Sequence, residues 1–170
     1  MSFPGAFLGG ANERLLPASI PFRYFGAAAV FHVAAWLALL LGGDELPHSI
    51  GGFGWPLAAL HLLTLGVLAM TAIGAALQLL PVATRQSLRA VWPARLIFWL
   101  FVPGVAALSH GMASGQELAL ALGAGLSSAG LLIAAALIAD NLLRAGDLAL
   151  VASYAWGALI SLLGLLALGL

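Results

Sequence analysis

The chain has 170 residues, of which 63% are hydrophobic and 7% are charged, and its formal net charge is +0. A soluble domain carries about 25% charged residues, so the composition excludes a water-soluble globular protein and predicts an integral membrane protein. The sequence has no cysteine. This excludes disulfides, zinc–thiolate sites, iron–sulfur clusters and covalent heme attachment through the protein's own thiols.

Apolar segments follow one another along the chain, each close to the roughly 20 residues that a helix needs to cross the hydrocarbon layer. They predict a single transmembrane domain over residues 1–170, an all-α polytopic bundle of about five helices. In chain order the helices are expected over residues 22–42, 55–80, 94–111, 117–139 and 148–170. We expect residues 1–21 to lie along the cytoplasmic interface, because the stretch "NERLLPAS" within them is too short and polar to span.

The cations indicate the orientation of these helices. All six are arginines, placed before or at the start of the first helix, between the second helix and the start of the third, and between the fourth and fifth: Arg14, Arg23, Arg85, Arg89, Arg95 and Arg144. Because successive crossings alternate sides, all six fall on one side, whereas the opposite connections hold Asp44, Glu45 and Glu117. The positive-inside rule then predicts a cytoplasmic N-terminus and an outer C-terminus, in a bacterial-type inner membrane. So few cations predict no nucleic-acid partner.

The expected topology gives each histidine a depth. His61 lies roughly 9 Å below the outer surface at 1.5 Å rise per residue, His110 near the same surface, His48 in an outer loop and His32 nearer the midplane. Intramembrane ionisable groups are functional candidates, and neutral imidazole ligates heme iron, copper and zinc. The alternatives are that His48 and His110 are hydrated interface residues and that His32 hydrogen-bonds a neighbouring helix.

The second helix carries distinct faces at 100° per residue. A small-residue stripe of Gly66, Met70 and Gly74 lies opposite His61 and is typical of close helix packing, with Met70 interpreted as core filler. A second, polar stripe beside the His61 face consists of Thr64, Thr71 and Gln78. This stripe indicates either a polar, cofactor-bearing cavity or hydrogen bonding between helices.

Later segments add packing features. In the third helix, Pro103 and Gly104 are expected to kink the helix or open its packing, which would make room for a macrocycle; the alternative is an ordinary membrane-helix proline. The fourth helix contains "ALGAGLSSAG", which permits close helix contact. Asp140 and Arg144 have an i,i+4 spacing that predicts a local ion pair.

The stretch "HLLTLGVLAMTAIGAALQLLPV", His61 to Val82, resembles the second membrane helix of heme–copper oxidase-like proteins, among them oxidase and nitric-oxide reductase catalytic subunits and the NnrS family. The resemblance is strongest over the first two helices and includes Leu65–Gly66, Gly74 and the Gln78–Pro81 ending. It implies that His61 is an axial ligand of heme b. The second ligand would be His110, His32 or a residue of another subunit.

Departures from these proteins exclude a complete oxidase or reductase, because the catalytic subunits have about twelve helices and further ligating histidines that this chain lacks. The outer side offers no arginine to the heme propionates, so copper is the alternative cofactor. Its ligands would be His61, His110 and His48, joined by Met112, because Cu(I) accepts thioether sulfur. No catalytic residue is predicted.

These observations predict a heme b-binding or copper-binding membrane protein that serves electron transfer, redox sensing or nitric-oxide-linked metabolism. It would contact the lipid bilayer and form a homo-oligomer or join a partner membrane subunit. The alternative is a cofactor-free structural subunit of a larger membrane complex.

Overall fold

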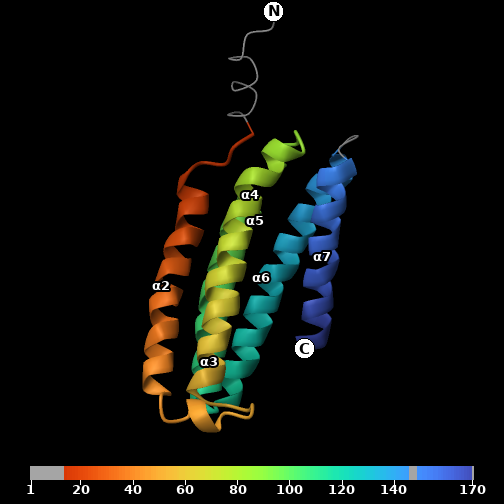
Figure 1. The fold of residues 1–170 in the computed structure, drawn as a ribbon. Coiled ribbons are helices and arrows are strands. Elements are labelled where there is room, and N and C mark those ends of the chain that lie inside the picture. Colours follow the sequence, from red (N-terminus) through yellow and green to blue (C-terminus); the bar gives the residue numbers. More distant parts are fainter. Residues whose placement is uncertain (1–13, 146–148, 170) are drawn as a thin grey trace, which may run out of the picture.

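The computed structural model describes residues 14–145 and 149–169, which form an up-and-down bundle of helices (Figure 1). The elements in chain order are α2 Ser19–Leu41, the short 3₁₀ helix η1 Leu46–His48, α3 Trp55–His61, the π-helix η2 Leu62–Ala69, α4 Met70–Ala83, α5 Trp92–Ser114, α6 Glu117–Arg144 and α7 Ala149–Gly169. Segments α3, η2 and α4 run without a break and form one long helix, Trp55–Ala83.

The predicted all-α architecture is confirmed. Four helices are long and apolar enough to cross a membrane: Ser19–Leu41, Trp55–Ala83, Trp92–Ser114 and Glu117–Arg144. The described part of α7 contributes a shorter apolar stretch, Ala152–Leu168. Residues 1–13 of the expected interfacial segment, together with Leu148 and Leu170 of the expected last helix, lie outside the described residues.

Helices α5 and α6 form the most intimate pair, and glycines of both helices make it possible. Gly104 and Gly111 of α5, and Gly123 and Gly130 of α6, are all buried. A Cβ on Gly104 would come within 2.6 Å of the Ser127 backbone nitrogen. Lipid tails are as apolar as leucine, so helices associate in a membrane through such close packing rather than through a hydrophobic driving force.

The predicted packing stripe of the second long helix is confirmed, and its partner is α2. A Cβ on Gly66 would lie 2.7 Å from Phe31 Cβ, and one on Gly74 would lie 2.8 Å from Tyr24 Cβ. Met70, between these glycines, is fully buried. Tyr24 extends the contact to α5, because its hydroxyl donates a 2.6 Å hydrogen bond to the Ala94 carbonyl.

Hydrogen bonds attach the connection between α4 and α5 to the last turn of α6. Asn141 is fully buried; its Oδ1 accepts a hydrogen bond from the Thr84 hydroxyl at 2.6 Å, and its Nδ2 donates to the Gln86 carbonyl at 2.7 Å. The predicted Asp140–Arg144 pair is also confirmed, with Nη2 and Oδ2 2.9 Å apart. These bonds explain why α6 continues to Arg144 instead of ending near residue 139.

The prediction about Pro103 and Gly104 is wrong where it expects open packing. Helix α5 runs unbroken from Trp92 to Ser114, and the space beside Gly104 is filled by Leu126 and Ser127 of α6. Pro103 itself is exposed, which agrees with the alternative of an ordinary proline on a membrane helix. A macrocycle therefore has no room at this position.

Helix α7 is the least integrated element. It packs chiefly against α6 (Figure 1). At its Gly157 and Gly164, a Cβ would meet no neighbouring atom within 4 Å among the described residues. Cavities lie between α7, α6 and the long helix Trp55–Ala83.

Two glycines of α6 provide a matched test of the close α5–α6 contact. In Gly123→Ala the new methyl group would meet the Leu108 backbone, whereas in Gly125→Ala it would meet open space. We expect Gly123→Ala to lower the free energy of unfolding by about 1–3 kcal/mol, the usual cost of overpacking. We expect Gly125→Ala to be neutral or stabilising by up to about 1 kcal/mol. Reversible unfolding in mixed detergent micelles measures both values, and equal effects would contradict the packing described.

Candidate functional site

His61 stands at a change in helix geometry. It is the last residue of the α-helical segment α3, and the π-helix η2 begins at the next residue and continues to Ala69. A π-helix bonds residue i to i+5; π-helices are rare, usually single-turn, and frequent at functional sites. The wider turn changes the angle between His61 and the residues that follow. It marks this part of the long helix as unlike an ordinary membrane span.

The His61 ring is oriented by its own helix. Its Nδ1 lies 3.0 Å from the carbonyl oxygen of Leu57. A carbonyl oxygen only accepts, so Nδ1 must carry the proton in this hydrogen bond. The neutral imidazole then presents an unprotonated Nε2, which is the form that ligates a metal or accepts a hydrogen bond. A backbone carbonyl on the other ring nitrogen is also the usual support of a metal-bound histidine.

His61 lines a cavity of about 340 Å³ among four helices, near the lower end of the range for small-molecule sites. The lining is largely apolar and comes from α3 and η2, α5, α6 and α7. It consists of His61, Thr64, Leu65, Ala69, Leu108, Met112, Ala124, Ser127, Ser128, Leu131, Leu165 and Leu166. A few polar groups in an apolar cavity are the usual composition of a ligand site.

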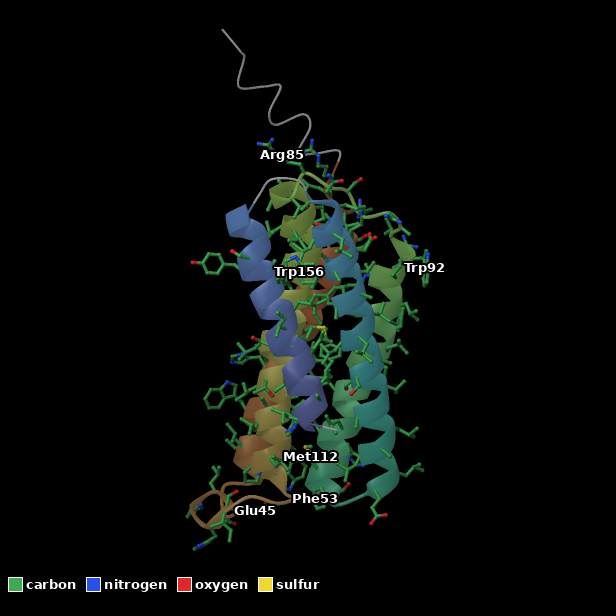
Figure 2. All side chains as sticks on the ribbon, turned by 90° about the vertical axis from the view of Figure 1, so that its right-hand side faces the viewer. Glu45, Phe53, Arg85, Trp92, Met112 and Trp156 are labelled. Atoms are coloured by element: carbon green, nitrogen blue, oxygen red, sulfur yellow. The ribbon has the colours of Figure 1, made fainter. Side chains whose placement is uncertain are left out.

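Met112 is the second predicted site residue on this cavity. A hydrogen bond ties its backbone to the start of the helix that bears His61: the amide of Gly54 donates to the Met112 carbonyl at 2.8 Å. Gly54 has a φ of 140°, a conformation that residues with a Cβ rarely adopt. In Figure 2, Met112 lies at the same end of the bundle as Glu45 and Phe53. The structure therefore brings His61 and Met112 onto one cavity.

The other three histidines do not line this cavity. His110 is exposed on α5, and His48 is exposed in η1. His32 is exposed on α2, where its Nε2 accepts a 2.8 Å hydrogen bond from the Trp36 indole. Among residues 14–145 and 149–169, no three His, Asp or Glu side chains are grouped closely enough to hold a metal ion.

The polar stripe expected beside His61 is only partly on the cavity. Thr64 lines it, with its hydroxyl donating to the Leu60 carbonyl at 2.8 Å. Thr71 is exposed and Gln78 is half-buried, and neither lines the cavity. A spacing of seven keeps one face only in a helix of constant α geometry, and the π-helix between Leu62 and Ala69 interrupts that geometry.

Sequence reasoning missed two further cavity residues, Ser127 and Ser128 of α6. They belong to a segment whose sequence indicates packing material, and for Ser127 that interpretation is sound. Its Oγ would lie 2.7 Å from a Cβ on Gly104, so the hydroxyl packs against α5. Ser128, which is half-buried, had no distinguishing signal other than its polarity in an apolar helix.

Charge is divided between the two ends of the bundle. At one end of the bundle, Arg144 donates a hydrogen bond to Asp140, and the Nε of Arg89 lies 3.4 Å from Asp140 Oδ1. Glu45 lies at the other end (Figure 2), where its Oε2 accepts a 3.0 Å hydrogen bond from the Trp55 amide at the start of α3. No cationic side chain lines the His61 cavity within the described residues.

Comparisons with protein-family models, with curated proteins and with solved structures found no match to this chain. Its function is therefore argued from its own residues.

The hydrogen bond to Leu57 leads to a spectroscopic prediction. In the neutral state, ¹⁵N NMR of the histidine side chains should show His61 in the Nδ1–H tautomer, because only that tautomer donates to a carbonyl. The His110 ring is exposed and makes no hydrogen bond to the described part of the chain, so it should show a mixture of tautomers. A predominant Nε2–H form of His61 would contradict the proposed free Nε2.

Proposed function

We propose that this chain is a heme b-binding integral membrane protein in which His61 supplies one axial ligand. The observation that carries the proposal is the His61 ring on a cavity among four helices, with its Nδ1 3.0 Å from the Leu57 carbonyl oxygen; this hydrogen bond leaves Nε2 as the nitrogen that can bind iron. The resemblance of residues 61–82 to heme–copper oxidase-like proteins suggests the same ligand. One-electron transfer is the chemistry that heme would supply.

Met112 is the best candidate for the second axial ligand. It lines the cavity that contains His61, whereas His110 and His32 are exposed elsewhere. Methionine and histidine together ligate heme iron in electron-transfer proteins and raise its reduction potential. Leu65, Leu108 and Leu131 would exclude water from the site, which also favours the less charged, reduced state of the iron.

The cavity offers ligands for the heme iron but few partners for the heme propionates. They favour cationic or hydrogen-bonding partners, and the cavity lining described above contains no arginine. Water, backbone amides or a second chain would have to meet them. Copper needs no such partners, and His61 with Met112 is a nitrogen and thioether pair that suits Cu(I). That pair alone is an incomplete site, so copper is the second choice.

The proposed setting is a bacterial-type inner membrane that the chain crosses five times. The arginines would face the cytoplasm, as the positive-inside rule requires. The His61 cavity would then lie toward the outer surface. With one or two ligands for a single heme, the protein would transfer electrons, sense redox state or act in nitric-oxide metabolism, and it would not form a complete oxygen- or nitric-oxide-reducing centre.

A cofactor-free subunit of a larger membrane complex is the second candidate function. The loose attachment of α7 favours it, because Gly157 and Gly164 on that helix have no described neighbour near their Cβ positions. Small exposed residues on a membrane helix permit close approach of another helix. In this case His61 would hydrogen-bond to a partner and ligate no metal.

Optical spectra of the purified protein, reconstituted with hemin, distinguish these functions. We expect a Soret band for the native chain, its loss in His61→Ala, and no change in the control His110→Ala. Met112→Leu should keep the heme but lower its reduction potential, because a thioether ligand raises that potential.

Three results would contradict the proposal: no Soret band and no bound copper in the native chain, equal heme binding by His61→Ala, or loss of heme only in His110→Ala. An intact, functional complex formed by His61→Ala without any spectral change would support the scaffolding role instead.

A further inference from the structure

A second cavity of about 290 Å³ lies beside the His61 cavity and shares Ala69 and Leu131 with it. One wall of this cavity is formed by the end of η2 and by α4, and the opposite wall is formed by α7. Helix α6 lies next to both. The cavity lining is wholly apolar: Ala69, Ala72, Ile73, Ala76, Leu80, Leu131, Ile138, Ala155, Ala158, Leu159 and Leu162. Ala72 and Ala158 are exposed, so the cavity is a groove that reaches the surface of the bundle.

The length and lining of the groove indicate the chemistry of its occupant. Ala69 and Leu80, the outermost lining residues on one wall, are separated by roughly 16 Å at 1.5 Å rise per residue. The groove has a volume of about 290 Å³, and only apolar side chains line it. A long groove with this lining suits an extended hydrocarbon chain.

A cation follows the helix that forms one wall of the groove. Leu80 lies three residues before Ala83, where α4 ends, and Arg85 is two residues beyond that end. Arg85 is exposed and has a φ of 58°, and in Figure 2 it lies at the end of the bundle where α7 begins. Arg89 and Arg144 are paired with Asp140, but Arg85 has no ion-pair partner among the residues described.

We propose that the groove binds one acyl chain of an anionic phospholipid whose phosphate pairs with Arg85. The hydrocarbon chain matches the apolar lining of the groove. The phosphate matches the guanidinium of Arg85, which has no ion-pair partner among the residues described. Guanidinium is the side chain best suited to phosphate, and cationic residues near a membrane surface attract anionic lipids. The site is separate from His61, so it does not depend on the proposed heme.

The test is native mass spectrometry of the full chain released from micelles that contain equal amounts of phosphatidylglycerol and phosphatidylcholine. The native chain should retain one phosphatidylglycerol in preference to phosphatidylcholine. Arg85→Gln should reduce this preference about fivefold, the effect of one arginine near an anionic surface. Ala158→Phe, which fills the groove, should reduce the retention of both lipids.

Arg95→Gln is the matched control, because Arg95 is exposed at the start of α5 and does not line the groove. It should leave both retention and preference unchanged. Equal losses in Arg85→Gln and Arg95→Gln would overturn the proposal in favour of nonspecific charge. Unchanged retention in Ala158→Phe would exclude the groove, and dissociation of a dimer by this substitution would show that a second copy fills it.

Discussion

Close approach of helix backbones at glycines is the interaction on which this fold depends. Gly104 and Gly123 let α5 and α6 meet, and Gly66 and Gly74 let α2 meet the long helix Trp55–Ala83. In a hydrocarbon solvent, burial of leucine against leucine gains little over leucine against lipid, so helices are selected by how closely they fit. The cavities lie where such close packing is missing. Helix α7 packs chiefly on α6, and space remains beside it.

The π-helix gives the long helix two different roles. Its glycine stripe packs on α2, and His61 at the start of the π segment lines a cavity bounded by α5, α6 and α7. A regular α-helix would carry the polar residues Thr64, Thr71 and Gln78 along one line, but only Thr64 reaches this cavity. The π turn separates Thr64 from the other two polar residues: Thr71 is exposed and Gln78 is half-buried on α4, away from the cavity.

Much of the fold could be predicted from sequence because its causes are local. Apolar length predicts the helices, i,i+4 spacing predicts the Asp140–Arg144 pair, and the spacing of Gly66 and Gly74 predicts the packing face. The site was less predictable, because it depends on which helices are neighbours. His110 and Met112 are two residues apart, yet only Met112 lines the His61 cavity. The Pro103–Gly104 sequence likewise does not indicate that α6 fills the space beside Gly104.

The separation of charge gives the two cavities different electrostatic surroundings. At the end with Glu45, no cationic side chain of the described residues lines the His61 cavity, which disfavours an anionic ligand and is the same constraint that the heme propionates would meet. At the other end, arginines outnumber their partner Asp140, which favours an anion. Ala69 and Leu131 line both cavities. An acyl chain in the groove would therefore seal the inner wall of the His61 cavity against water and, by lowering the local dielectric, strengthen every polar interaction inside it.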